Sequence, residues 1–408
     1  MQMGDSILMF VATLLVWLMT PGIALFYGGM VRSKNVLSTA MYSLSSIAII
    51  SVLWIIAGYS LAFSTAGNPF IGGLDWVGLQ GVSFEPNPDY SATIPHSLYM
   101  MFQLTFAVLT CAIISGAFAE RMRFSAFVLF SVLWTFLVYA PVAHWVWGVG
   151  GWLRDLGALD FAGGNVVHIS SGVAGLVLAL VIGTRKSKNS VSPHNLPLTL
   201  LGGVLIWFGW FGFNVGSALT LNDVAMTAFI NTNTAAATGI IGWIAVEWLI
   251  NKKPTMLGAI SGAIAGLVAI TPACGFVTPS ASIIIGLVGG AVCFWGVFFL
   301  KEKLGYDDAL DAFGLHGIGG TWGGIATGLF ATTSVNSAGA DGLFYGNAGL
   351  LLKQLIAIGA TYVFVGVVTF ILIKAVSFVV SIRASEEEES MGLDLTLHGE
   401  KAYQESNL

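Results

Sequence analysis

Residues 160–176, DFAGGNVVHISSGVAGL, place His168 among glycines, small polar residues and aliphatic side chains. A second histidine, His316, lies in HGIGGTWG at 316–323, which shares the spacing His-x3-Gly-x2-Gly with HISSGVAG at 168–175. Two matching stretches in two apolar regions indicate an internal repeat, a common feature of polytopic membrane proteins. The two histidines are therefore expected at corresponding positions of two related halves.

The composition is that of a membrane protein. Of the 408 residues, 56% are hydrophobic and only 9% are charged, whereas a soluble domain carries about 25% charged residues. We therefore expect an all-α polytopic membrane protein with no nucleic-acid partner. The three cysteines are scattered through apolar segments, which is typical of apolar filling and not of a disulfide framework or a metal site: Cys111, Cys274 and Cys293.

Eleven apolar runs are long enough to be candidate spans, since a helix needs about 20 apolar residues to cross a bilayer. The first run begins within the amino-terminal stretch MQMGDSILMF, which lacks the basic region of a signal peptide, so we expect the run to be retained as a span. The runs lie near 6–30, 36–63, 95–119, 125–149, 163–183, 197–220, 226–250, 256–273, 279–300, 312–332 and 348–382.

Lysine and arginine gather in every second loop, and this alternation predicts the orientation. The basic loops contain Arg32/Lys34, Arg121/Arg123, Arg185/Lys186/Lys188, Lys252/Lys253 and Lys301/Lys303. Because basic loops stay in the cytoplasm, the amino end is expected outside and the carboxyl end in the cytoplasm.

The same pattern predicts the domain organisation. The transmembrane domain is expected to cover residues 1–383, with halves at about 6–183 and 197–332 and a last helix at about 348–382. Five spans per half is an odd number, so the second half should enter from the opposite side, as an inverted five-plus-five repeat.

Two polar segments are long. Residues 64–94 contain Asp75, Glu85 and Asp89 and no lysine or arginine, which indicates an ordered external loop. Residues 384–408, ASEEEESMGLDLTLHGEKAYQESNL, form a cytoplasmic tail whose composition alone indicates a solvated, mobile end.

The histidine rings can meet only if one or both helices begin inside the membrane, as discontinuous helices do around a cavity. Asp160 would then cap such a helix start. A single buried histidine usually serves packing, but a repeated pair favours function, because ionisable groups in spans tend to mark pathways.

Three functions suit such a pair. A metal site needs three or four ligands, and no cysteine or carboxylate lies within a turn of either histidine. The pair could also ligate a haem at its two axial positions. The third function is a narrow pore in which two neutral imidazoles bond each other and a small polar solute.

Aromatic side chains favour the pore. Phe102 and Phe106 share one helix face, as do Trp210, Phe213 and Ser217, and Trp147 ends the fourth span on the outer side. Such aromatic stripes often pack in the protein core or form the aromatic belt at the membrane interface. They would also bind a small cation through cation–π attraction of about 0.5–2 kcal/mol. That attraction cannot offset full desolvation of an ion, so a cation would have to lose its proton or share it with the imidazoles.

The ordered motifs LFYGGMVRSKN (25–35), FQLTFA (102–107), GAFAERMRF (116–124), DFAGGNVVHISSGVAGL (160–176), GWFGFNVGSA (209–218) and DDALDAFGLHGIGGTWG (307–323) resemble those of the ammonium transporter family, on the Amt side of the Amt/MEP/Rh superfamily. The resemblance covers the chain from about residue 5 to the tail. It implies a multi-pass protein of the cell membrane with eleven helices per protomer, a homotrimer, one pore in each protomer, and no enzymatic activity, metal or cofactor.

The resemblance also implies roles for individual residues. Ammonium, with methylammonium as its analogue, would be recruited by Trp147, Phe106 and Ser217, with Phe102 nearby and Asp160 in support, and deprotonated. Phe106 and Phe213 would form a gate, His168 and His316 the twin-histidine pore, and Trp210 would line that pore.

The tail segment MGLDLTLHGEKAY resembles a regulatory region that packs across the inner face, where a PII-type protein of the GlnK kind can bind. An ammonium sensor is the alternative within the same class. It would need an added signalling domain, for which we expect residues 384–408 to leave no room, while sensing through the tail itself stays an open alternative.

Overall fold

Helices occupy all eleven ranges that the apolar runs predict. The computed structural model describes residues 1–186 and 192–403. Several helices are continued by short π-helical or 3-10 helical (η) segments. The long segments are α1 (Met3–Met30), α2–η2–α3 (Val36–Leu53, Trp54–Gly58, Tyr59–Phe63), α4–η4 (His96–Ile114, Ser115–Phe118), α5–η5–α6 (Phe124–Trp134, Thr135–Tyr139, Ala140–Trp147), η6–α8 (Gly164–Ile169, Ser170–Ile182), α9 (Leu196–Gly216), α10 (Asp223–Asn251), α11 (Met256–Ile270), α12–η7–α13 (Pro279–Trp295, Gly296–Leu300, Lys301–Leu304), η8–α14 (Phe313–Gly317, Ile318–Phe330) and α15 (Ala348–Val379).

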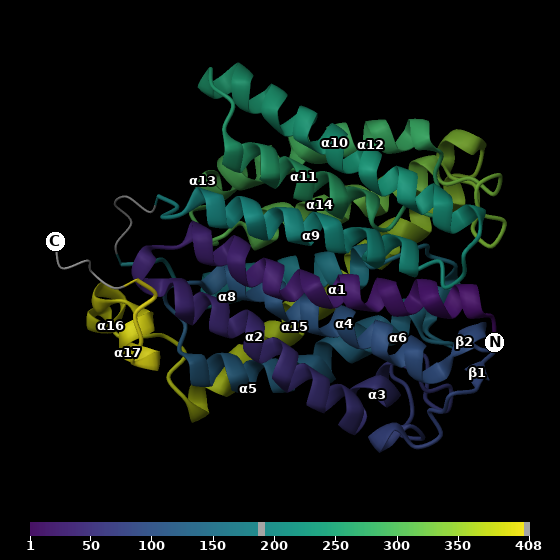
Figure 1. Ribbon diagram of the computed structural model, residues 1–408, viewed down its shortest axis with the longest axis horizontal. Helices are drawn as coiled ribbons and strands as arrows, with labels where there is room; N and C mark the ends of the chain where they lie inside the picture. Colours follow the sequence, from purple (N-terminus) through teal and green to yellow (C-terminus); the bar gives the residue numbers. More distant parts are fainter. Residues whose placement is uncertain (187–191, 404–408) are drawn as a thin grey trace.

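The remaining elements are short and lie at the two ends of the helix bundle (Figure 1). We call them the loop end, where the amino terminus and residues 64–95 lie, and the tail end, where the last two helices lie. The short elements are η1 (Ser33–Asn35), η3 (Val77–Leu79), β1 (Pro86–Asn87), β2 (Ser91–Pro95), α7 (Trp152–Leu156), η9 (Leu343–Tyr345), α16 (Glu386–Met391) and α17 (Leu393–His398).

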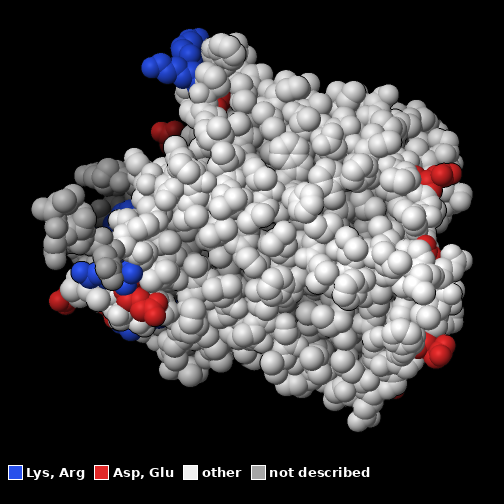
Figure 2. Space-filling model, in the orientation of Figure 1, with Lys and Arg blue, Asp and Glu red and all other residues white. Residues whose placement is uncertain are grey.

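The surface agrees with a membrane protein. In the described residues, nine helices are long and apolar enough to cross a membrane, and α11 is a shorter apolar helix. Figure 2 shows a wide uncharged band between the two ends, with Lys and Arg at the tail end and only acidic residues at the loop end of this face. The chain is therefore a multi-pass membrane protein, while eleven crossings and the orientation of the termini stay predictions.

The first helices of the two halves pack against each other in opposite directions. Glycines on α9 face α1: an added Cβ at Gly202 would lie 2.2 Å from Phe26 N, and one at Gly209 would lie 2.3 Å from Met19 Cγ. Residue numbers therefore rise along α1 as they fall along α9. Small residues of this kind allow membrane helices to approach closely.

The two histidine-bearing helices also run in opposite directions. The α8 helix ends at the tail end, where Ile182 O accepts a hydrogen bond from Arg383. The helix formed by η8 and α14 instead starts from the tail end, just after Asp307, and runs to the loop end. This antiparallel arrangement is what an inverted repeat requires.

The loop predicted at residues 64–94 is ordered. It contains the antiparallel pair β1–β2 and is tied to the helices by backbone bonds, among them Gly72 N to Leu61 O at 2.7 Å and Trp152 N to Pro69 O at 3.1 Å. The amino terminus joins it through Gln2 N to Thr93 O at 2.7 Å.

Candidate transport pathway

The two histidine rings lie in contact with each other inside the bundle. His168 Nδ1 lies 3.1 Å from His316 Nδ1, and the rings are stacked at 5.2 Å between centroids. Both side chains are buried, and each stands in the π-helical first segment of its helix, His168 in η6 and His316 in η8. A hydrogen bond between the rings requires one Nδ1 to donate and the other to accept.

A buried aspartate sets the start of each of these helices. Asp160 accepts from Gly163 N (2.8 Å), Gly164 N (2.6 Å) and Asn165 N (2.8 Å). Asp308 accepts in the same way from two amides at the start of η8, at 3.1 and 2.7 Å. Each aspartate satisfies orphan donors of a helix start. Sequence reasoning found Asp160 but missed Asp308, although both lie eight residues before their histidine.

The repeated glycine of His-x3-Gly explains how the rings come so close. A Cβ at Gly172 would lie 2.3 Å from Gly317 N, beside His316. In the other half, a Cβ at Gly320 would lie 3.1 Å from His168 Cβ. Each glycine thus leaves room for the backbone or side chain at the histidine of the opposite half. The motif shared by the two halves therefore allows the two histidines to pack closely.

An aromatic column leads from the loop end to the histidines. Phe106 and Phe213 stack at 4.3 Å, and Phe213 stacks on His168 at 5.8 Å. Phe102 and Trp147 make T-shaped contacts with Phe106, with ring centroids 4.8 and 5.8 Å apart. Trp210 stacks on His168 at 5.3 Å and donates to Thr271 Oγ1 at 2.9 Å. The structure therefore brings all the predicted aromatic residues into one column.

A cavity of about 210 Å³ opens above this column at the loop end. Phe102, Phe106, Trp147 and Ser217 line it, and Ser217 Oγ donates to Phe213 O at 2.9 Å, which leaves its lone pairs free to accept. Sequence reasoning missed other lining residues that come from loops or lie between the predicted positions: Asp89, Tyr90, Gln103, Arg154 and Phe161.

Asp160 supports the cavity from behind and does not line it. Its backbone O accepts from Trp147 Nε1 at 3.0 Å, while its carboxylate is occupied by the amides of η6. Arg154 Nη1 donates to Trp147 O at 2.7 Å and fixes the tryptophan from the other side. The orientation of Trp147 therefore depends on two residues of the connection between α6 and η6.

Below the histidines the passage is narrow and apolar. A space of about 20 Å³ is lined by His316, Trp210 and Leu315 together with aliphatic and aromatic residues of the neighbouring helices: Met19, Ile23, Phe26, Tyr27, Leu109, Ile113, Ile206 and Ile264. That volume is about what one water-sized molecule needs. His168 Nε2 is buried without a hydrogen-bond partner among the described residues.

This geometry disfavours two of the three functions considered for the pair. In the described residues, no three His, Cys, Asp or Glu side chains are grouped as metal ligands. The histidine rings are in direct hydrogen-bonding contact, which leaves no space between them for a macrocycle. The geometry is compatible with the third function, a narrow pore, which stays a prediction.

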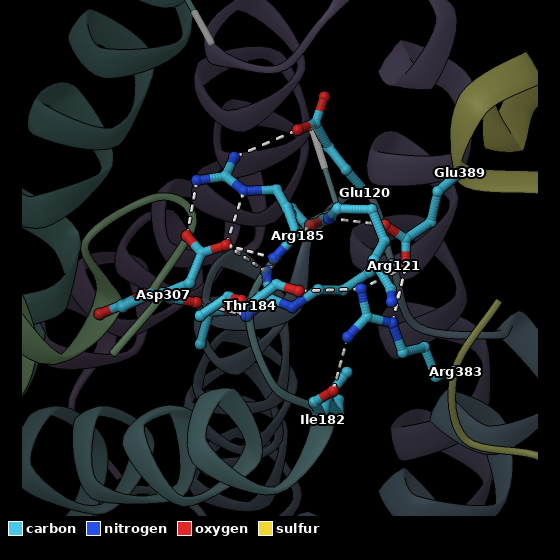
Figure 3. Close-up of polar contacts among 12 residues, drawn as sticks. Glu120, Arg121, Ile182, Thr184, Arg185, Asp307, Arg383 and Glu389 are labelled. Carbon is cyan, nitrogen blue, oxygen red and sulfur yellow. Dashed lines mark hydrogen bonds and ion pairs between the residues drawn. The ribbon is translucent and has the colours of Figure 1, made fainter. Parts of the chain in front are cut away.

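A buried ion-pair network joins the loops of the tail end. Glu120 accepts from Arg32 Nε at 2.9 Å and Arg185 Nη1 at 3.1 Å, and Arg185 also pairs with Asp307 at 2.7 Å. Figure 3 shows Arg185 between Glu120 and Asp307, with Arg383 beside them. Burial opposes ionisation of Asp307, but hydrogen bonds and the charges of Arg185 and Arg121 lower the pKa of its carboxyl to about 2.

The tail is part of this network. Arg383 donates to Ile182 O (3.0 Å) and Thr184 O (2.9 Å) and pairs with Glu389 at 2.7 Å. Asp394 accepts from the first amides of α2, at 3.0 and 2.7 Å. For residues 384–403 the expectation of a mobile end, drawn from composition, was wrong, because the acidic side chains have specific partners in the loops.

Membrane-length helices around a buried column of aromatic and histidine rings define a multi-pass protein of the channel or transporter class. The family model described as Ammonium Transporter Family matches residues 7–403, so the chain belongs to the ammonium transporter family. Members of this family are transporters and not enzymes.

Individual relatives agree over nearly their whole length. The chain is 78% identical over 406 residues to an ammonium transporter of Bacillus subtilis (strain 168), covering 100% of both chains. The crystal structure of Saccharomyces cerevisiae Mep2 matches with a TM-score of 0.90 and 38% identity, over 100% of this chain and 93% of that one. A structure described as Sensor Amt Protein matches with a TM-score of 0.90 and 28% identity, over 97% and 98% of the two chains.

Proposed function

We propose that the chain carries ammonium across the cell membrane through one narrow pore in each protomer, with the loop end outside and the tail end in the cytoplasm. Eleven helices would cross the membrane, as an inverted five-plus-five repeat followed by α15. The concentration of Lys and Arg at the tail end supports this orientation, because basic loops stay in the cytoplasm.

Ammonium would first bind in the loop-end cavity. Trp147 and Phe106 offer ring faces to a cation, Phe102 closes the same side, and the free lone pairs of Ser217 Oγ can accept from an N–H. Cation–π attraction contributes about 0.5–2 kcal/mol. This binding collects the ion, with Asp160 holding Trp147 in place from behind.

Charge cannot pass the Phe106–Phe213 stack unaided. Desolvation of an isolated ion costs tens of kcal/mol in the Born limit, far more than cation–π attraction to the aromatic rings contributes. The space below the histidines holds about one water-sized molecule. Ammonia would therefore cross as the neutral molecule after the ion loses its proton at the outer side. Phe106 and Phe213 would act as the gate and Trp210 would line the lumen.

The observation that carries this mechanism is the His168–His316 pair. When one Nδ1 donates to the other, one Nε2 of the neutral pair must donate and the other must accept. The pair thus presents one donor and one acceptor to a passing ammonia and can transfer a proton between its two rings. His168 Nε2, buried without a partner in the described part of the chain, fits that role.

The tail and the assembly form the second part of the proposal. We expect a homotrimer and a regulatory tail over residues 384–408, and a PII-type (GlnK-like) protein that binds the tail end. The ordered contacts of α16 and α17 with the cytoplasmic loops support a regulatory tail. Deleting residues 384–408 should spare membrane insertion and alter the response of uptake to nitrogen status; an unchanged response would oppose the regulatory role.

Uptake by the purified protein in liposomes tests the transport function. Radiolabelled methylammonium should accumulate when the inside is electrically negative, and excess ammonium should compete with it. Empty liposomes and liposomes that contain an unrelated helical membrane protein are the controls. Uptake no faster than in the controls would oppose the proposal.

A further inference from the structure

Gln103 is a buried side chain of the loop-end cavity whose amide oxygen has no partner. It follows Phe102 on α4, lines the cavity and is only 7% exposed. Its Oε1 is buried and accepts no hydrogen bond from any described residue. Leaving a buried acceptor unpaired costs free energy, so such groups usually bond a protein donor, a water or a ligand. Because no described residue donates to this oxygen, the cavity is the place from which a donor can come.

The position of Gln103 on α4 places it at the outer end of the aromatic column. Tyr99, Gln103 and Phe106 are spaced i, i+4 and i+7, so they follow one face of the helix, and all three line the cavity. Since α4 starts at the loop end, after β2, Gln103 lies about one turn outside Phe106. It therefore stands on the outer side of the ring that stacks on Phe213.

The cavity offers few other acceptors to an ion with four N–H groups. Ser217 Oγ has free lone pairs, and the rings of Phe106 and Trp147 attract positive charge with their faces. Asp89 and Arg154 also line the cavity, but their charges are opposite. A neutral amide oxygen can bond the ion without adding a full negative charge. Binding of that strength suits a pathway, because an ion that is held too tightly does not move on.

We infer that Gln103 is a further residue of the ammonium site, where its Oε1 accepts one N–H of the ion and Ser217 Oγ accepts another. The inference rests on the proposed function, because it names an acceptor for the ion that the cavity is proposed to recruit. Gln103 belongs to the first half of the chain, and Ser217, at the end of α9, belongs to the second. The ion therefore bridges the two halves immediately outside the Phe106–Phe213 stack.

Loss of the amide oxygen should change ammonium binding and protein stability differently. Leucine is close to glutamine in size but has no polar side-chain atom, so Gln103→Leu removes the unpaired acceptor. Removing a buried acceptor that has no partner relieves its desolvation cost, so the variant should be no less stable than the wild-type protein without ammonium. Losing a hydrogen bond to a charged group should weaken ammonium binding by about 10- to 100-fold. A role in packing alone would leave the affinity unchanged.

Thermal unfolding of the full chain in lipid nanodiscs measures both effects. Ammonium chloride replaces sodium chloride at constant ionic strength, and the rise in Tm with ammonium concentration gives an apparent Kd, because a ligand of the folded state stabilises it by mass action. For Gln103→Leu we expect an apparent Kd about 10- to 100-fold above that of the wild-type protein, and an unchanged or higher Tm in sodium chloride alone. Thr105→Val is the matched control and should keep the wild-type Kd. Thr105 is also buried on α4, does not line the cavity, and its hydroxyl already donates to Phe102 O at 2.6 Å.

A second variant decides the question if Gln103→Leu fails to fold. Gln103→Glu keeps an acceptor oxygen and should bind ammonium at least as tightly as the wild-type protein. The inference is overturned if Gln103→Leu keeps the wild-type Kd, or if Gln103→Glu binds ammonium more weakly than the wild-type protein. No rise in Tm with ammonium in the wild-type protein would instead oppose recruitment by the cavity, and with it the proposed function, so the two failures are distinguishable.

Discussion

Gly172→Ala should separate the two histidines without altering either one. The added carbon would lie 2.3 Å from Gly317 N and 2.5 Å from Gly317 Cα, whereas ordinary contact begins at 3.4 Å. Both obstacles are backbone atoms, so the helices must move apart by about 1.1 Å, because a packed interior has no free space to take up the methyl group. The 3.1 Å contact between the rings would then exceed hydrogen-bond distance.

Two magnitudes follow from this displacement. Overpacking of this kind destabilises a protein by about 1–3 kcal/mol, so the variant should still fold. A misplacement of about 1 Å at a reacting centre can reduce a rate by about 10²-fold. We therefore expect a modest loss of thermal stability and a fall of about two orders of magnitude in ammonium-driven current.

The assay is the transient current of liposomes on a supported membrane after an ammonium jump, with thermal unfolding of the same preparation. Gly175→Ala, one turn along α8, is the matched control, since its Cβ would meet Ala117 Cβ at 3.0 Å and Ala312 Cβ at 3.6 Å. That variant should keep most of the current. A folded Gly172→Ala protein with wild-type current would refute the dependence of transport on this helix contact.

Four further predictions concern the cavity, the helix start and the tail end. Trp147→Ala should raise the ammonium concentration for half-maximal current by about 2- to 30-fold, which is the cation–π term expressed as affinity; an unchanged concentration dependence would exclude Trp147 from recruitment. Asp160→Asn puts a side-chain NH2 group opposite backbone N–H groups of η6 that now donate to the carboxylate, so two donors would face each other. Thermal unfolding should show a free energy of unfolding lower by about 1–3 kcal/mol; wild-type stability would contradict the capping role. Arg383→Ala should speed hydrogen exchange across 386–398, and unchanged protection would mean that other contacts hold the tail. The pKa of Asp307 is lowered from 3.8 to about 2, so the stabilisation from its ion pairs is complete above pH 3.8 and is lost as the pH falls towards 2. Hydrogen exchange of residues 183–186 should therefore rise over that pH range in the wild-type protein and not in Asp307→Asn.

The elements that depend on local patterns were predicted well. Apolar runs of membrane length predicted the ranges of the helices, and the repeated His-x3-Gly-x2-Gly motif predicted that His168 and His316 meet. The aromatic residues of the column were found because helical spacing places them on shared faces. Fewer helices than predicted meet the length and hydropathy expected of a span, nine among the described residues. The α11 helix is too short, and the glycine-rich helix η8–α14 is also not among the nine.

Features that depend on distant contacts were missed. Tyr90 reaches the cavity only because its loop folds back onto the ends of α3 and α6, and no local pattern encodes that return. Glu120 and Arg185 are far apart in sequence, and their pairing follows from how the loops meet at the tail end. Asp308 was overlooked because its segment reads as a polar loop, although its spacing to His316 repeats that of Asp160 to His168.

The central claim is that the two imidazoles pass on the proton that ammonium loses. The current after an ammonium jump tests this claim most directly. It is measured across a range of pH for the wild-type protein and the His168→Ala/His316→Ala double variant, at equal amounts in the membrane. The account predicts a pH-dependent current in the wild-type protein and none in the double variant. A double variant that carries the wild-type current with the same pH dependence would contradict it.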